Sequence, residues 1–257
     1  MNDDVYGIKK WGNDILEILE NGNIGLKNPF HPDNSPADLI KIIKSLNERG
    51  ISCPVLLRVT DYLAFRIKQI NNSFFRAIRE IRYKGEYKGV FPVKVNQQAQ
   101  VIDRIVEFGK EFDFGLEVGS KPELLIALAH DLSANSTIIC NGIKDREFIH
   151  LAILSIKIGF KTILVLESPR ELDLIIKISK ELNVRPLLGI RVKLTNKVSG
   201  NWSQSSGDRS AFGLSVEQVM EVINKLKIYD YLDCLILQHS HLGSQIPDII
   251  EIRKATQ

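Results

Sequence analysis

The sequence predicts an α/β protein built on a parallel sheet, and two observations carry this prediction. From about Val90 onward, short apolar runs of strand type alternate with longer helical patterns, as they do in repeated βα units. Most of these runs are rich in Val, Ile, Leu or Phe and lack polar alternation, which is typical of strands buried on both faces. The 257 residues, 44% of them hydrophobic, suffice for one large barrel or two small domains.

The expected elements repeat in structure but not in sequence. Ser120 and Glu123 predict a capping box with Pro122 in the first turn, and Gly109 and Gly159 fall where helices should end. We expect strands at 90–95, 112–117, 137–140, 162–167, 187–193 and 233–242. We expect helices at 97–109, 121–130, 146–159, 170–182 and 215–228.

Six strands of this type fit either a (β/α)₈ barrel that is cut short or a doubly wound open sheet that is complete, and composition does not separate the two. Upstream, residues 62–83 have the pattern of one long helix, and residues 54–59 could form a strand before it. The first fifty residues contain turn signals such as Asn21-Gly22. We therefore expect a small β-rich segment at 1–50 and the α/β part at 51–257.

Charge and cysteine content narrow the possible partners and the compartment. Lys and Arg total 34 against 31 Asp and Glu, and they are scattered, so no nucleic-acid surface is expected. Cys53, Cys140 and Cys234 have no pairing or metal spacing, which favours a reducing compartment. The N-terminus lacks a signal-peptide pattern, and no apolar run approaches the roughly 18 residues that span a bilayer. We expect a soluble cytoplasmic protein without a membrane partner.

Polar residues stand at the carboxyl end of every expected strand. In a parallel barrel these ends form the active site, so the residues would converge on one mouth. A polar segment at 195–209 follows the fifth strand and is either functional or disordered. The residues at the strand ends are Lys94, Asn96, Glu117, Asn141, Glu167, Arg191, Lys193, His239 and His241.

Lys94 is the most informative of them. A lysine between Val93 and Val95 in an apolar strand would lose hydration, which lowers its pKa and favours the neutral amine that forms a Schiff base with an aldehyde cofactor. Alternatively, the side chain extends to the strand end or pairs with Glu117. Spacing alone leaves both interpretations open.

The other candidates also have structural alternatives. Glu117 could pair with a neighbouring cation. His239 and His241 share a face and could bind zinc with a carboxylate from another strand, or they could be hydrogen-bonded packing residues. No third ligand can be assigned, so we expect no metal site here. Gly243-Ser244 would suit a phosphate but is too short to be diagnostic.

The segment Phe91-Pro92-Val93-Lys94-Val95-Asn96-Gln97 resembles the cofactor-lysine strand of biosynthetic arginine decarboxylases. The likeness runs from about Val5 to the last residue and keeps the order and spacing of the family. Taken together, the motifs distinguish this family from the shorter ornithine and diaminopimelate decarboxylases. The segments that resemble the family's second, third, fifth and sixth strands are 115–124, 140–147, 188–191 and 239–245.

The resemblance implies a pyridoxal-phosphate-binding (β/α)₈ barrel of the alanine racemase and ornithine decarboxylase type, truncated after about the sixth strand. It implies that Lys94 bonds to the cofactor, Glu117 is a carboxylate in its pocket and Arg191 is a polar wall. His241 would lie over the pyridine ring, and Ser244 would touch the phosphate. The implied activity converts L-arginine to agmatine and carbon dioxide in polyamine biosynthesis, with Mg²⁺ as a possible accessory ion.

Two departures from the family pattern matter. Ala211 precedes Phe212-Gly213 where the family has a basic residue, so that contact is lost or moved to Arg209. The family's chain also continues into strands seven and eight and a C-terminal β domain, which completes the site in a homo-oligomer. We therefore expect the isolated chain to be inactive. The alternatives are a non-catalytic cofactor-binding or regulatory remnant of the family, and a decarboxylase of the diaminopimelate or ornithine type.

Overall fold

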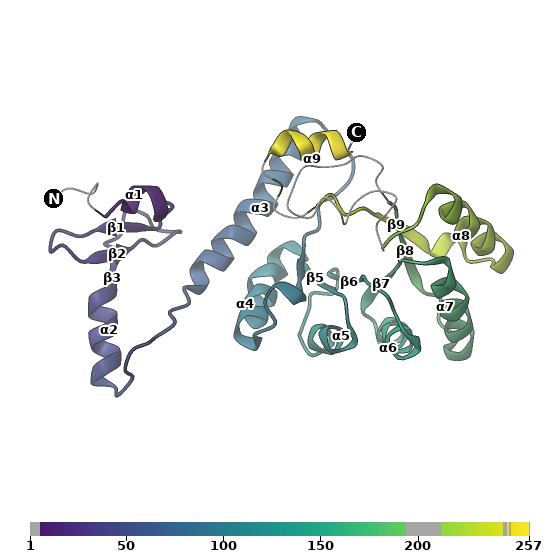
Figure 1. Ribbon diagram of the computed structural model, residues 1–257, viewed down its shortest axis with the longest axis horizontal. Helices are drawn as coiled ribbons and strands as arrows, with labels where there is room; N and C mark the ends of the chain where they lie inside the picture. Colours follow the sequence, from purple (N-terminus) through teal and green to yellow (C-terminus); the bar gives the residue numbers. More distant parts are fainter. Residues whose placement is uncertain (1–5, 194–211, 244–245, 247, 257) are drawn as a thin grey trace. The chain divides into compact units, whose positions relative to one another are not determined.

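The computed structural model describes residues 6–193, 212–243, 246 and 248–256 (Figure 1). The chain forms two compact units, Met1–Glu86 and Tyr87–Gln257. The division at residue 50 that we infer from the sequence remains a proposal about domains. The expected functional segment at 195–209 lies outside the described residues.

The first unit contains the expected β-rich segment. Three short strands form an antiparallel sheet in the order β1-β2-β3. Asp38, the last residue of this sheet, also begins a helix, because its carboxylate accepts hydrogen bonds from the N–H groups of Ile40 and Lys41 at 2.9 and 3.2 Å. The elements are α1 (Ile8–Trp11), β1 (Leu16–Ile18), β2 (Ile24–Leu26), β3 (Ala37–Asp38), α2 (Leu39–Glu48) and α3 (Thr60–Glu80).

Two predictions for this unit need correction. Residues 54–59 form no strand. Helix α2 was not expected, although Leu39, Ile42 and Leu46 recur at helical spacing behind the capping residue Asp38. The turn signals around this short helix favour a β-rich interpretation of the whole segment, although the helix interrupts it.

The second unit is a six-stranded parallel sheet in the order β4-β5-β6-β7-β8-β9, with helices α4 to α8 on one side of it (Figure 1). The sequential order and the helices on a single side are those of a partial barrel, which confirms the predicted fold class. The strands are β4 (Val90–Pro92), β5 (Gly115–Val118), β6 (Thr137–Cys140), β7 (Lys161–Leu166), β8 (Leu187–Arg191) and β9 (Leu235–His239). The helices are α4 (Ala99–Gly109), α5 (Lys121–Leu128), α6 (Arg146–Lys157), α7 (Pro169–Leu182), α8 (Val216–Tyr229) and α9 (Ile249–Thr256).

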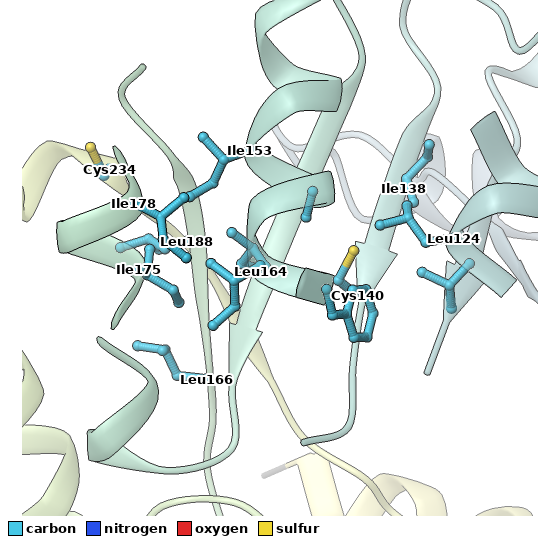
Figure 2. Close-up of a cluster of buried hydrophobic side chains, with 14 of the residues drawn as sticks. Leu124, Ile138, Cys140, Ile153, Leu164, Leu166, Ile175, Ile178, Leu188 and Cys234 are labelled. Carbon is cyan, nitrogen blue, oxygen red and sulfur yellow. The ribbon is translucent and has the colours of Figure 1, made fainter. Parts of the chain in front are cut away.

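The side chains of the sheet alternate between two environments. One set, which includes Ile138, Leu164 and Leu188, packs with helix residues in a continuous buried cluster (Figure 2). The other set forms a smaller apolar cluster around Ile139 and Ile163. Because adjacent residues of a strand face opposite sides, the strands themselves separate the helix-packed core from the face that carries the site.

Several strand boundaries differ from the predicted ones. Strand β4 ends at Pro92, and Val93–Val95 forms a 3₁₀ turn. Strand β5 begins only at Gly115, because Asp113 adopts a left-handed conformation with φ 52°. None of the described helices is both long and apolar enough to cross a membrane.

Candidate functional site

A cavity of about 880 Å³ lies on the face of the sheet that carries Ile139 and Ile163. Its volume falls within the roughly 300 to 1,000 Å³ typical of small-molecule sites. Apolar side chains line one part of it, and polar side chains from the strand ends line another. Four of the five residues proposed from the sequence line this cavity, namely Lys94, Glu117, Arg191 and His241. The fifth, Ser244, lies outside the described residues.

Lys94 reaches the site from an unexpected local structure. It sits in the 3₁₀ turn after β4 and is exposed, so the expected strand through Val95 is wrong, and the desolvated one of the two interpretations left open for Lys94 does not hold. The turn places Val93 in the core with no exposed surface, and it leaves Val95 67% exposed. Lys94 is still close enough to His239 and His241 for its charge to contribute to lowering their pKa values.

Glu117 is buried at the end of β5 and is held by a neighbouring strand end. The side-chain amide of Asn141 donates a hydrogen bond to Glu117 Oε1 at 3.0 Å. The other polar atom of the amide, Asn141 Oδ1, is buried and has no hydrogen-bond partner among the described residues. A buried acceptor without a partner is costly, so this atom marks a place where a ligand or water donor would fit.

Arg191 is anchored by a carboxylate that sequence reasoning placed at a strand end but did not include among the cofactor contacts. Glu167 Oε1 accepts hydrogen bonds from Arg191 Nη1 at 3.1 Å and from the Gly142 N–H at 3.0 Å. The guanidinium also lies 5.5 Å from the centre of the Phe212 ring, within cation–π range. These contacts hold Arg191 at the wall of the cavity.

The two histidines are biased toward their neutral form. Burial lowers the pKa of His239, and the positive charge of Arg191 lowers it further, while Glu167 opposes the shift. Partial burial and the charges of Arg191 and Lys94 lower the pKa of His241 in the same way. A neutral imidazole can accept a hydrogen bond or stack on a flat ring without adding charge.

The metal interpretation of the histidines finds no support in the described part of the chain. No group of three or more His, Cys, Asp or Glu side chains there could hold a metal ion. All three cysteines are free, and Cys140 and Cys234 are buried.

The capping residue Glu123 braces the loop after β5. The N-cap of α5, Ser120, accepts a hydrogen bond from the Glu123 N–H, which is one half of the predicted capping box; the other half, a bond from the Ser120 N–H to the Glu123 carboxylate, is not formed. The Glu123 carboxylate returns to the N–H of Gly119 at 2.7 Å, and it also accepts from the Gln97 side chain at 3.2 Å. One helix-capping carboxylate thus ties together the loops after β4 and β5 at the edge of the cavity.

Comparisons with known proteins agree with this geometry. Residues 67–257 match the model of the family described as pyridoxal-dependent decarboxylase, pyridoxal binding domain. The chain is 46% identical over 252 residues to a biosynthetic arginine decarboxylase of Prochlorococcus marinus (strain MIT 9312) and 45% identical to one of Gloeobacter violaceus. Each alignment covers 98% of this chain but 39% of the relative, so the chain spans about two fifths of their length.

The solved structures give the same result. The biosynthetic arginine decarboxylase SpeA from Campylobacter jejuni superposes with a TM-score of 0.85 at 35% identity, over 99% of this chain and 39% of that one. A diaminopimelate decarboxylase from M. jannaschii shares the fold, with a TM-score of 0.71 at 22% identity over 95% of this chain and 52% of that one. Together with the family match over residues 67–257, these similarities show that the chain belongs to the pyridoxal-dependent decarboxylases and carries their pyridoxal-binding domain.

Proposed function

We propose that this protein is an arginine decarboxylase, which converts L-arginine to agmatine and carbon dioxide for polyamine biosynthesis. The observation that carries the proposal is the 46% identity, over 98% of the chain, to a biosynthetic arginine decarboxylase. The diaminopimelate alternative receives less support, because the diaminopimelate decarboxylase from M. jannaschii is 22% identical and shares the fold alone. Arginine is preferred to ornithine because the relatives at 45 to 46% identity are arginine decarboxylases. We also propose a cytoplasmic location, in keeping with the three free cysteines.

The cavity fits pyridoxal phosphate in size, charge and unfilled hydrogen bonds. Lys94 and Arg191 provide positive charge for an anionic ligand. Asn141 Oδ1 and His239 Nδ1 are buried without hydrogen-bond partners among the described residues, so the site offers polar contacts to an incoming group. When bound, pyridoxal phosphate supplies an aldehyde that bonds to amines and a ring that accepts the electrons released at Cα.

The residues of the chain then have separate tasks. Lys94 would hold the cofactor through its amine, and its exposed position leaves it accessible to an exchanging substrate amine. His241 would lie against the ring as a neutral imidazole, and Ser244 would contact the phosphate. Glu117, fixed by Asn141, keeps a carboxylate in a buried position, and Arg191, fixed by Glu167, forms a polar wall. The contribution of these residues is binding and orientation.

Gene deletion provides a test that does not depend on reconstituting the site. Extracts of the source organism that lack the coding sequence should lose the conversion of labelled arginine to labelled agmatine. Reintroducing the wild-type gene should restore it, whereas the Lys94→Ala variant should not. Agmatine formation at the original rate in the deletion strain would contradict the proposal.

A further inference from the structure

Lys144 is a buried lysine that lines no part of the cavity. It lies in the loop between β6 and α6, and its side chain has 0% exposure. Its ammonium donates hydrogen bonds to the carbonyl oxygens of Gly142 at 2.5 Å and Val165 at 2.6 Å, and it lies 3.4 Å from Glu171 Oε2. Two hydrogen bonds and one ion pair therefore compensate the buried ammonium.

Glu171 completes this arrangement from the first turn of α7. Its carboxylate accepts hydrogen bonds from the backbone N–H of Lys144 at 2.9 Å and from the backbone N–H of Glu167 at 2.8 Å. Burial lowers the pKa of Lys144, and the charges of Glu171 and Glu167 oppose this shift. The pair thus joins two strand ends through both its charge and its backbone contacts.

The contacts lead from this pair to the wall of the cavity. Gly142 uses its carbonyl to accept from Lys144 and its N–H to donate to Glu167. Glu167 in turn receives the hydrogen bond from Arg191. Gly142 adopts φ +76°, and a Cβ there would stand 3.2 Å from the Gly119 carbonyl oxygen, so this position of the loop favours glycine. A change in the separation of the β6 and β7 ends would therefore displace Glu167 and Arg191.

We propose that Lys144 is a positioning residue for the cofactor site. By bonding to the carbonyls of Gly142 and Val165, it fixes the spacing between the ends of β6 and β7, and through Glu167 it sets the orientation of Arg191. The structural part of this inference stands on the contacts alone. Its consequence for pyridoxal phosphate binding rests on the proposed function.

The test uses Lys144→Met, which keeps most of the side-chain length and removes the ammonium. The matched control is Lys121→Met, because Lys121 is exposed and pairs with Asp145 and Glu147 beside the same loop. We expect Lys144→Met to accelerate hydrogen exchange at the Gly142 and Glu167 amides by about tenfold or more through local opening. The affinity for pyridoxal phosphate should fall by a similar factor. Lys121→Met should change neither quantity.

A double variant separates positioning from charge balance. Lys144→Met combined with Glu171→Gln removes both charges, and single Glu171→Gln provides its baseline. If Lys144 positions the strand ends, the double variant recovers thermal stability relative to Lys144→Met but keeps the fast Gly142 exchange and the weak binding. If Lys144→Met does not fold, the double variant is compared with Glu171→Gln alone.

The outcomes distinguish this inference from the proposed function. Unchanged Gly142 exchange in the Lys144→Met variant would overturn the inference. Recovery of both stability and Gly142 protection in the double variant would also overturn it, because charge balance alone would then explain the pair. A third outcome is that Lys144→Met shows fast Gly142 exchange while the wild-type chain binds no pyridoxal phosphate. This result would refute the proposed function and leave the positioning role of Lys144 supported.

Discussion

Arg191 and His239 stand opposite each other in the parallel pairing of β8 and β9. Burial is the largest cause that lowers the pKa of His239, and the positive charge of Arg191 is the second largest. The same two causes, in the same order, lower the pKa of His241. The Glu167 carboxylate holds Arg191 in place and pulls both pKa values in the opposite direction. The protonation of the two histidines therefore reports on the geometry of the cavity wall.

Replacing Arg191 should raise the pKa of both histidines. In Arg191→Met, the lowering charge is gone and Glu167 remains, so the pKa values should move upward toward the ordinary value of about 6.5. NMR titration of the imidazole protons measures this shift. Arg185→Met is the control, since Arg185 is an exposed arginine that pairs with Asp233. If the pKa values of His239 and His241 do not change in Arg191→Met, the charge of Arg191 does not lower them.

The lowered pKa values of His239 and His241 in the folded wild type also predict how its stability depends on pH. A histidine with a lowered pKa in the folded state takes up its proton more readily when the chain unfolds. His239 and His241 therefore favour the folded state above about pH 6.5 and lose this contribution as the pH falls toward their folded pKa values. Denaturant unfolding at a series of pH values should show a shallower dependence in the His239→Gln variant than in the wild type. An identical slope in this range would show that His239 does not contribute.

Lys94 should be the residue that bonds covalently to pyridoxal phosphate. Borohydride treatment of the chain with cofactor should fix the pyridoxyl group on Lys94, and peptide mass spectrometry should locate it. Lys88 also lines the cavity, so Lys88→Ala is the informative control, and this variant should still carry the pyridoxyl group on Lys94. Fixation on Lys88 with Lys94 unmodified would make the assignment wrong.

Sequence patterns predicted those parts of the site that depend on order along the chain. Strand β6 matches its predicted bounds, because Thr137 and Asn141 delimit a short β-branched and apolar run. The convergence of six strand-end residues on the cavity followed from the rule that parallel strands end at one edge, whereas Asn96, Glu167 and Lys193, expected at the same mouth, are not among the residues that line it. The bond between Glu167 and Arg191 was not predictable in this way, since it depends on how the ends of β7 and β8 align in space.

Lys94 shows why local structure was harder to predict than the site itself. The pattern Val93-Lys94-Val95 fits a strand, but the ladder with β5 ends at Pro92 and the chain turns. A 3₁₀ turn of three residues has no periodicity that a sequence pattern can detect. Lys94 therefore lines the cavity as expected, although its strand was wrongly predicted, and of the two interpretations that spacing left open the desolvated one does not hold.

The edge of the described sheet should make the chain prone to association. Strands β4 and β9 are the outer strands of the described sheet, and Ile236 in β9 is 54% exposed at a register shift. Unpaired strand edges with exposed apolar side chains invite pairing with other chains. We expect the 257-residue chain to bind an apolar dye and to self-associate in sedimentation experiments, and Ile236→Lys should reduce both. A monomer with a sharp cooperative melt and no dye binding would contradict this.

The 257-residue chain assayed alone should release carbon dioxide from arginine only near the background of free cofactor, even when Mg²⁺ is supplied. Lys94 and His241 are both exposed at the mouth of the cavity, so the described residues leave the reacting groups in contact with solvent. Positioning of reactants can lower the reaction barrier by about 7 to 11 kcal/mol. A cavity that is open to water loses much of this stabilisation, because solvent competes for the reacting groups. The assay measures labelled carbon dioxide from carboxyl-labelled arginine, with Lys94→Ala as the blank and host decarboxylase excluded. Turnover of roughly 1 per second or faster, in the range of ordinary enzymes, would show that the chain encloses its substrate without further groups and would overturn this prediction.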